Sequence, residues 1–320
     1  MSSKLRKGLT SSERNYLGKI ARLYYLEDLS QQHIARRMNV SIATVSRTLN
    51  KARQYKIVKI LIDESPDGAG EMEQVIEQRW NLQECTVVAG HDHLENTYQQ
   101  MASVMTDLLS RLVQPGSTVG VSWGVTLKTI GENLGSVPGQ DVKVIPIIGA
   151  MGEVDTGIYP NGIAREFAEH LRGKPYMVNI PAVVDDRGIR DSMLRDSYYR
   201  SVRQIWESLD IAIMSVSGLD EDTSMFRTGI FSAEELATLR QLGGTCATNF
   251  SVLDANGQVL ENPISGRIVG LPFPELEDVR HVVIAAAGRS KAMALRSALN
   301  SGVVTRLITD VECAQLLLGE

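Results

Sequence analysis

The sequence of 320 residues lacks several features that would direct it away from the cytosol. It has no run of 18 uncharged apolar residues, which argues against a membrane-spanning helix. Its only three cysteines, at positions 85, 246 and 313, form neither a disulfide framework nor a zinc-binding spacing, as is usual in a reducing compartment. The first ten residues include basic side chains but no apolar signal core follows them. We therefore expect a cytoplasmic protein without a membrane partner.

The distribution of charge separates the chain into two parts. Lysine and arginine total 33 against 38 acidic residues, which gives a net charge of −5. Residues 1–62 nevertheless contain six lysines, seven arginines and only three acidic residues, a net charge of +10, so the remainder carries −15. A basic segment on an acidic body is typical of a protein that contacts nucleic acid with one part only.

Residues 30–56, SQQHIARRMNVSIATVSRTLNKARQYK, have the pattern of two short helices joined by a sharp turn. The first helix carries an apolar stripe made of Ile34, Ala35 and Met38. Asn39 follows where the chain must turn, because asparagine tolerates the left-handed conformation. Ser41 is placed to cap a second helix that starts at Ile42. This pattern predicts a helix-turn-helix that binds double-stranded DNA.

The side chains that point outward from the second helix are of the types that read DNA. Arginine can fork onto guanine, asparagine can pair with adenine, and serine or threonine can contact bases or phosphates. We expect base contacts from Ser41, Ala43, Thr44 and Arg47, and phosphate contacts from Lys51 and Arg53. The full predicted interface is Gln31, Gln32, Ser41, Ala43, Thr44, Ser46, Arg47, Asn50, Lys51 and Arg53. The alternative is an ordinary helical hairpin with a solvated polar face.

The length and a composition of 43% hydrophobic and 22% charged residues predict two globular domains. A helix over residues 13–26, capped at Ser12, would pack on the helix-turn-helix, and the alternating apolar run at 57–62 would add the strand of a winged helix. The sequence DESPDGAG is polar and rich in proline and glycine, so it is expected to be a linker. The expected organisation is a DNA-binding domain over 1–62, a linker over 63–70 and a second domain over 71–320.

From residue 71 onward, apolar strand patterns alternate with helical patterns. Strands are expected at 86–89, 118–122, 142–148, 176–180, 211–216, 282–286 and 305–308. Helices are expected at 95–113, 163–172, 232–242 and 291–300. The alternation predicts an α/β fold, a doubly wound, mostly parallel sheet with helices on both faces. Residues 246–270 differ and suggest short antiparallel strands around a turn at Asn256-Gly257.

In such a sheet, ligands bind beyond the carboxyl ends of the strands. The turn after residues 118–122 reads GVSWGVT, where Gly120 and Gly124 permit close approach of backbone, and Ser122 and Thr126 supply hydroxyls. Free amides at the start of the next helix favour an anion, and a phosphate is the simplest guest. The alternative is a tight turn that needs glycine only for steric reasons.

Two other strand ends carry polar residues. Lys291 stands in the first turn of a predicted helix, where the helix dipole disfavours a cation, so we expect an anionic ligand beside it. The alternative is a solvated lysine. Thr309 and Asp310 follow the last predicted strand, where Asp310 is either a ligand group or the cap of the final helix.

Other polar clusters fit structural roles better than chemical ones. His91-Asp92-His93 fits a polar loop rather than a metal chelate, Asp185-Asp186-Arg187 fits a turn cap, and the acidic run at 220–222 fits a solvated surface. No nucleophile and base stand out as a pair. We therefore expect no catalytic residue, no metal ion and no cofactor.

Taken together, these segments resemble the SorC-type transcriptional regulators, the sugar-binding branch of the DeoR-like regulators. The resemblance covers nearly the whole chain, because the helix-turn-helix, GVSWGVTL, NIPAVVDD, GIFSAEEL and AAAGRSKAMALRSALNSGVVTRLITD stand in the family's order. It implies that the second domain has the fold of ribose-5-phosphate isomerase and glucosamine-6-phosphate deaminase, used as a sensor of phosphorylated sugars or similar metabolites. It also implies a homotetramer built from dimers.

By position, the resemblance assigns the effector contacts to a phosphate-binding turn, a second strand-end loop and a lysine. These residues are Ser122, Trp123, Gly124, Thr126, Gly149, Ala150 and Lys291. Members often have Gly-Asp-Ile where this chain has Cys246-Ala247-Thr248. The polar residue expected at the sugar hydroxyls is therefore Ala247, so either the effector is unusual or Asn249 substitutes.

The function predicted from the sequence is a DNA-binding transcriptional regulator of a carbohydrate catabolic operon. Its binding to operator DNA would be controlled by a small-molecule effector, a phosphorylated sugar or related metabolite. One alternative is an enzyme, a sugar-phosphate isomerase or deaminase with a nucleic-acid-binding head. A second alternative is a constitutive DNA-binding protein whose second domain only oligomerises.

Overall fold

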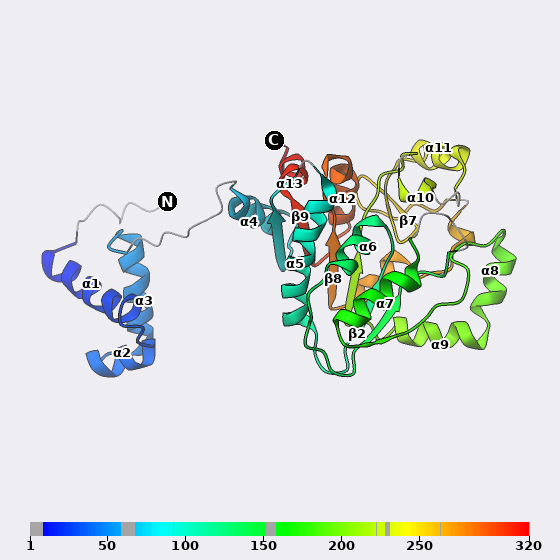
Figure 1. Ribbon diagram of the computed structural model, residues 1–320. Helices are drawn as coiled ribbons and strands as arrows, with labels where there is room; N and C mark the ends of the chain where they lie inside the picture. The colour runs from blue at the N-terminus through cyan, green and yellow to red at the C-terminus, as the bar shows by residue number, and fades with distance from the viewer. Residues whose placement is uncertain are drawn as a thin grey trace. The chain divides into compact units, whose positions relative to one another are not determined.

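The computed structural model describes residues 9–58, 68–91, 93–151, 158–221, 223–227, 231–262 and 264–319. The chain divides into two compact units, residues 1–63 and 64–320, and each is described by itself. Figure 1 shows that the first unit is helical and that the second is a helix-covered sheet. Within the described ranges, no helix combines the length and the apolar character needed to cross a membrane.

The first unit consists of α1 (Ser11–Tyr25), α2 (Gln31–Met38) and α3 (Ile42–Gln54). Its core is made of apolar side chains from all three helices, Leu17, Ile20, Leu23, Ile34, Val45 and Leu49. Asn39 ends α2 with φ 52° and ψ 49°, and the Ser41 hydroxyl accepts a hydrogen bond from the Thr44 N–H at 3.1 Å. The sharp turn and the cap of the second helix are therefore confirmed.

Two details of the first unit differ from the prediction. Helix α1 begins two residues earlier than expected, because Thr10 rather than Ser12 caps it in a reciprocal pair with Glu13. The predicted strand at 57–62 lies outside the described residues from position 59 onward. Ile57 and Val58 form a bend, because their N–H groups donate to the carbonyl of Ala52 at the end of α3.

The second unit is built on a seven-stranded sheet in the order β1-β9-β8-β5-β2-β3-β4, and every pairing is parallel. The strands are β1 (Glu84–Val88), β2 (Thr118–Val121), β3 (Lys143–Pro146), β4 (Lys174–Pro175), β5 (Ile211–Met214), β8 (His281–Ala285) and β9 (Arg306–Asp310). All residues of β2 and β5 are buried, as expected of strands covered on both faces.

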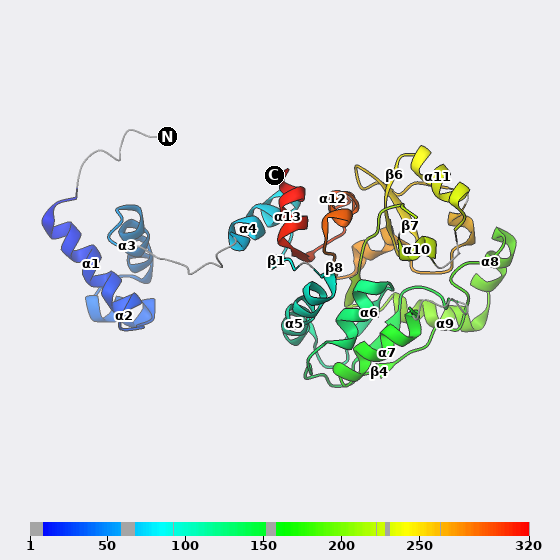
Figure 2. The same ribbon diagram turned by 45° about the horizontal axis from the view of Figure 1, so that its top comes forward.

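Helices cover both faces of this sheet, which confirms the doubly wound α/β fold (Figures 1 and 2). One face packs on α5 (Leu94–Leu112), α6 (Val125–Glu132) and α7 (Pro160–His170). The other face packs on α4 (Ala69–Trp80), α9 (Ser197–Trp206), α12 (Ala292–Asn300) and α13 (Val311–Leu318). The remaining helices are α8 (Arg187–Leu194), α10 (Ser224–Arg227) and α11 (Ala233–Gln241).

The strand predicted at 176–180 is absent, and β4 is only the dipeptide Lys174–Pro175. Pro175 has no N–H for the ladder. Beyond it, the side-chain amide of Asn161 bonds both the N–H and the carbonyl of Val178, at 2.9 and 3.1 Å. Val178 therefore satisfies its backbone through α7, whereas the N–H of Tyr176 still donates to the carbonyl of Val144 in β3 at 2.7 Å.

A two-stranded antiparallel sheet stands apart from the main sheet. It pairs β6 (Gly244–Thr248) with β7 (Ser251–Asp254), and the connecting turn is Asn249-Phe250, with φ values of 47° and 62°. The predicted turn at Asn256-Gly257 is also present and follows β7, where the Asp254 N–H donates to the carbonyl of Gln258. The turn that the sequence did not reveal is the one that reaches the candidate site.

Candidate ligand pocket and nucleic-acid interface

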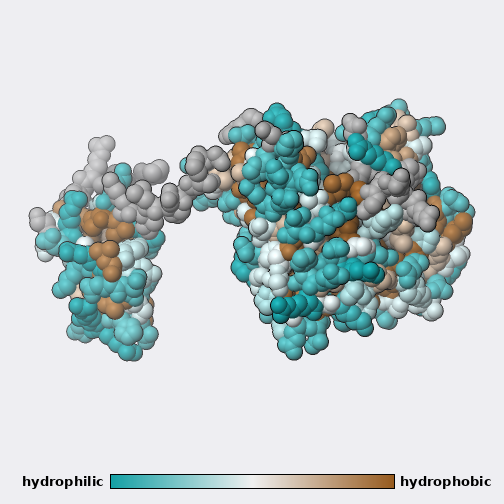
Figure 3. All heavy atoms as spheres, in the orientation of Figure 1, coloured by the Kyte–Doolittle hydropathy of each residue, from teal (hydrophilic) through white to brown (hydrophobic). Residues whose placement is uncertain are grey.

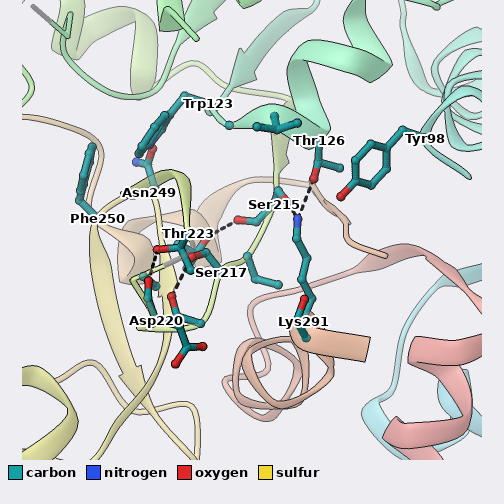
Figure 4. A pocket seen from close by; sticks show the side chains of 17 residues that line it. Tyr98, Trp123, Thr126, Ser215, Ser217, Asp220, Thr223, Asn249, Phe250 and Lys291 are labelled. Carbon is teal, nitrogen blue, oxygen red and sulfur yellow. Dashed lines mark hydrogen bonds between the residues drawn. The ribbon is translucent and has the colours of Figure 1, made fainter. Parts of the chain in front are cut away.

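A cavity of about 350 Å³ opens at the carboxyl ends of the central strands. Its lining follows three strands and the hairpin turn: 123–126 after β2, 215–218 after β5, 290–291 after β8, and 247–250 at the end of β6. Tyr98 of α5 adds a side chain that lies beside Thr126 (Figure 4). The location agrees with the rule that ligands bind outside the carboxyl edge of an open α/β sheet.

Lys291 is the cationic group of the cavity. Its ammonium donates to Thr126 Oγ1 at 2.6 Å and to Ser215 Oγ at 3.1 Å, and lies 5.9 Å from the centre of the Tyr98 ring. It makes no ion pair with any carboxylate of the described residues. Burial away from water lowers the pKa of Lys291 to about 8. An ammonium held this way by neutral oxygens is a ready partner for an anion.

Two helices begin beside this ammonium. Helix α6 starts after Gly124, whose φ of 125° is accessible to glycine and strained for other residues. Helix α12 starts after Lys291, preceded by a single 3-10 turn, Arg289–Lys291. No side chain caps either helix start. The first N–H groups of a helix point outward and carry partial positive charge, so the start of α6 favours an anion beside the ammonium. At α12 the preceding 3-10 turn already uses the N–H groups of Lys291 and Ala292, which bond the carbonyls of Gly288 and Arg289.

An aromatic wall forms another side of the cavity. The rings of Trp123 and Phe250 stack with centroids 5.1 Å apart and an angle of 21° between planes. Phe231 supports Phe250 from behind at 5.5 Å. Phe250 occupies positive φ, a strained conformation for a bulky side chain, so the surrounding packing must hold it in place.

Asn249 fixes the turn that presents this wall. It is buried, its side-chain N–H groups donate to the carbonyls of Ile147 and Leu271 at 3.0 and 2.8 Å, and its Oδ1 accepts the Ser122 hydroxyl at 3.0 Å. Both amide protons are therefore used inside the protein. Asn249 borders the cavity, and its side-chain hydrogen bonds position the hairpin and leave no amide donor for a sugar.

The structure brings together only some of the predicted effector residues. Five of them line the cavity, namely Trp123, Gly124, Thr126, Asn249 and Lys291. Four do not: Gly120, Ser122, Gly149 and Ala150.

Tight packing explains why these four residues stand away from the cavity. A Cβ at Gly120 would lie 2.4 Å from Ile147, and one at Gly149 would lie 2.6 Å from the carbonyl oxygen of Ile180. The N–H of Ala150 donates to the carbonyl of Ile180 as well, and the hydroxyl of Ser122 donates to the side chain of Asn249. The two glycines and these neighbours therefore pack around the cavity without lining it, and their assignment as effector contacts stays a prediction.

Sequence reasoning missed several residues of the lining. Ser215 and Ser217 follow β5, so the strand-end rule could have identified them from the predicted strand at 211–216. Tyr98 and Thr223 could not be found this way, because they come from a helix face and a surface loop. Ala247 lines the cavity, so an apolar methyl group does occupy a lining position there.

Residues considered for other chemistry prove to be caps. The buried carboxylate of Asp310 accepts the N–H of Cys313 and of Gly288, each at 3.1 Å, and caps α13. Asp186 caps α8 through the N–H groups of Gly188 and Ile189. Asp92 of the His-Asp-His run lies outside the described residues. Among those described, no group of three or more metal-ligating side chains exists.

The outer face of α3 carries most of the predicted DNA-binding side chains. Val45, Thr48, Leu49 and Ala52 are buried against α1 and α2, which leaves Ala43, Arg47, Asn50, Lys51 and Arg53 exposed. Arg53 bonds the Asn50 side chain at 2.5 Å, and Arg47 Nε donates to the carbonyl of Ala43 at 3.2 Å. The Ser41 hydroxyl is engaged with Thr44, so Ser41 serves first as the cap.

Ile42 is a residue of this face that the prediction missed. It is the first residue of α3 and is 51% exposed, although it is a large β-branched apolar side chain. Its place at the beginning of the helix was recognised, but not its exposure. Its spacing gave no signal, because Ile42 precedes the buried Val45 by three residues and the buried Leu49 by seven, which is the spacing of one helix face.

Comparison with known proteins places both units. A family described as a sugar-binding domain matches residues 65–319, and region 4 of sigma-70 matches residues 22–55. The sorbitol operon regulator of Klebsiella pneumoniae is 28% identical over 314 residues, which are 96% of this chain and 99% of that protein. The deoxyribonucleoside regulator of Bacillus subtilis (strain 168) is 27% identical over 304 residues, 94% of this chain and 96% of that protein.

Solved structures agree with these relatives. The full-length sorbitol operon regulator SorC from Klebsiella pneumoniae superposes with a TM-score of 0.74 at 26% identity, covering 96% of this chain and all of that chain. A DeoR family transcriptional regulator from Listeria monocytogenes gives a TM-score of 0.70 at 25% identity, covering 78% of this chain and 98% of that chain. The likeness therefore extends over both units in the first case and over the sheet unit in the second.

Proposed function

This chain belongs to the family of SorC-type sugar-binding transcriptional regulators, and we propose that a phosphorylated sugar or related metabolite controls its binding to operator DNA. The observation that carries the proposal is the Lys291 ammonium, unpaired with any described carboxylate and placed beside the uncapped start of α6. A phosphate there would meet a full positive charge and outward N–H groups. We propose that Trp123, Gly124, Thr126 and Lys291 form the effector contacts.

The proposed DNA interface is the outer face of α3. Arg47 and Asn50 are exposed on it and are of the types that pair with guanine and adenine in the major groove. Ile42 at the start of the helix adds an apolar group suited to the methyl of thymine. Lys51 and Arg53 at the far end suit phosphates. The net charge of +10 over residues 1–62 supports an interface with nucleic acid in this unit.

The proposed regulation is a coupling between the two ligands. A DNA-binding head reads a half-site, and paired heads read half-sites about 34 Å apart, one helical turn. We propose a homotetramer built from dimers, in the cytoplasm, in which the effector favours one spacing of the heads. A coupling free energy of about 1–3 kcal/mol would change operator affinity severalfold to more than a hundredfold. The regulated genes are proposed to form a carbohydrate catabolic operon, as for the sorbitol operon regulator.

We propose that the sheet unit senses its ligand without converting it. Isomerisation or deamination needs a general base near the sugar carbons. Asp310, the acidic residue that follows the last strand, is buried as a helix cap and does not line the cavity. The only acidic residue among the described lining residues is Asp220, whose side chain is 71% exposed. These positions support sensing rather than turnover.

The proposal is tested by a thermal-shift screen of the full chain against sugar phosphates, polyol phosphates and their unphosphorylated counterparts. A ligand that binds the native state raises the melting temperature by mass action. Lys291→Ala should abolish the shift from phosphorylated compounds, whereas Lys128→Ala, which removes a partly exposed lysine on α6 outside the cavity, should preserve it. Shifts caused only by unphosphorylated compounds would contradict the phosphate assignment. Product formation from any phosphorylated compound would favour the enzyme alternative.

A further inference from the structure

The polar groups of the cavity are sorted by hydrogen-bonding role, with donors at one end and acceptors at the other. The donor end contains the Lys291 ammonium and the uncapped start of α6. Away from it lie Ser217 and Thr223, which Figure 4 shows on the Asp220 side of the cavity, and Thr248 also belongs to the lining. Whether these three hydroxyls can donate to a ligand depends on whether their protons are already used within the protein.

Each of the three hydroxyl protons is already used. Ser217 Oγ donates to the carbonyl of Gly218 at 2.7 Å, and Thr223 Oγ1 donates to the carbonyl of Asp220 at 2.7 Å. Thr248 Oγ1 donates to the carbonyl of Ser215 at 3.1 Å. A hydroxyl has one proton and two lone pairs, so these groups can only accept from a ligand. This part of the lining therefore favours ligand groups that donate hydrogen bonds.

Charge reinforces the same selection. Lys291 is the only lysine, arginine or histidine among the described lining residues, and Asp220 contributes a negative charge at the far side. Arg240, the nearest described cation to that carboxylate, is 4.0 Å from it and outside the lining. A second anionic group on the ligand would face oxygen lone pairs and a carboxylate with no cation to meet it. An anionic group without a partner is costly to take out of water.

We infer that the site selects a ligand with one anionic end, whose other end carries hydrogen-bond donors such as hydroxyls and bears no second anionic group. This inference rests on the proposed function, because it takes the Lys291 end as the phosphate subsite. It separates polyol and sugar monophosphates, which fit, from bisphosphates and phosphorylated sugar acids, which do not. The methyl of Ala247 and the ring of Phe250 add no donor, and the indole N–H of Trp123 is one uncharged donor that brings no positive charge to a second anionic group.

The test uses matched pairs of probes that differ only at the far carbon. Glycerol 3-phosphate is compared with 3-phosphoglycerate, and glucitol 6-phosphate with 6-phosphogluconate, by calorimetric titration of the full chain at pH 7. In the pair that binds, the alcohol should bind about tenfold or more tighter than the acid, because the acid replaces a donor by an anion. A bisphosphate, fructose 1,6-bisphosphate, should also bind more weakly than the alcohol.

Two variants test whether the preference for the alcohol over the acid arises from this lining. Thr223→Lys places a cation among the acceptors and should reduce the alcohol-to-acid ratio about tenfold, since the acid gains a partner. Ser217→Ala removes one acceptor and should weaken the alcohol severalfold. The matched controls are Thr238→Lys and Ser110→Ala, whose hydroxyls also donate to backbone carbonyls but stand outside the cavity. Both controls should retain the wild-type ratio.

The outcomes distinguish the inference from the proposed function. Tighter binding of the acid or the bisphosphate, abolished by Lys291→Ala, would overturn the inference and leave the phosphate subsite standing. Equal binding of both members of a pair would also overturn it, since it would show that the far end is not selected. Absence of binding by every phosphorylated probe, or binding unchanged by Lys291→Ala, would overturn both together.

Discussion

Lys291 Nζ lies 2.6 Å from Thr126 Oγ1, and this hydrogen bond joins the first turns of two helices that follow different strands. Helix α6 follows β2 and helix α12 follows β8, while Ser215 at the end of β5 accepts a second hydrogen bond from the same ammonium. One cation thus ties together the carboxyl ends of three strands. A ligand that binds this ammonium therefore lies beside all three strand ends. It either replaces the hydrogen bonds to Thr126 and Ser215 or adds another one.

The depressed pKa of Lys291, about 8, makes binding of a phosphorylated effector depend on pH. The dianionic phosphate is formed above about pH 6, and the ammonium is lost as pH rises through 8. Affinity should therefore be greatest near pH 7 and fall toward a limiting slope of about tenfold per pH unit above pH 8. Titration calorimetry from pH 6 to 9.5 measures this profile. Lys291→Arg should bind with a flat profile over pH 8 to 9.5, since a guanidinium keeps its proton there; an equal decline in that variant would assign the effect to another group.

Asn249 should be important for stability as well as for the shape of the cavity. Asn249→Gly removes the side chain but keeps a residue that tolerates φ of 47°, so it isolates the loss of the hydrogen bonds. Two buried carbonyls lose their partner, and the free energy of unfolding should fall by about 2–3 kcal/mol in urea. Ser122→Ala removes only one of the three hydrogen bonds and should cost about 1 kcal/mol. Equal losses in the two variants would contradict the role given to the donated bonds.

Ile42 should read thymine through its methyl group. Duplexes selected from a random pool with the wild-type protein provide a tight site, in which each thymine is then replaced by uracil. The replacement removes only a methyl, and at a contacted position it should weaken wild-type binding about threefold to fourfold, the effect of one buried methyl group. Ile42→Ala should lose this sensitivity, while Leu26→Ala, which removes a side chain 76% exposed at the end of α1, should keep it. Unchanged binding at every uracil position would refute the contact.

Arg47 and Lys51 should affect DNA binding in different ways. Arg47→Ala should relax preference at one base pair and cost about 1–3 kcal/mol on the selected duplex. Lys51→Ala should weaken all duplexes about equally and lower the slope of log affinity against log salt by about one. Fluorescence anisotropy at several salt concentrations measures both. If neither variant changes affinity, α3 is not the helix that enters the groove.

The sequence predicted best those features that depend on neighbouring residues. Asn39 ends the first helix by its left-handed conformation and Ser41 caps the second by a local hydrogen bond, and the structure reproduces both. Lys291 was identified because its position in a first helical turn is anomalous by itself. The predicted alternation of strands and helices also held, since strands buried on both faces have continuous apolar runs.

What could not be predicted depends on contacts distant in sequence. Gly120 and Gly149 have the appearance of ligand-binding glycines, yet only the packing of Ile147 and Ile180 shows that they make room for protein. The direction of the Asn249 amide is set by carbonyls 102 and 22 residues away. Within the strand predicted at 176–180, the backbone of Val178 is bonded by the side chain of Asn161, which the local pattern does not reveal.

The stacked pair of Trp123 and Phe250 gives the molecule an optical property of its own. The chain has three tryptophans, and the other two are engaged elsewhere, Trp206 with the carbonyl of Pro146 and Trp80 with the side chain of Asn300. Trp123 alone borders the cavity. A ligand bound in the cavity changes the surroundings of the Trp123 indole and leaves the other two indoles as an internal reference. Occupancy of the cavity is therefore readable in the emission of the unlabelled protein, with Trp123→Phe as the silent counterpart.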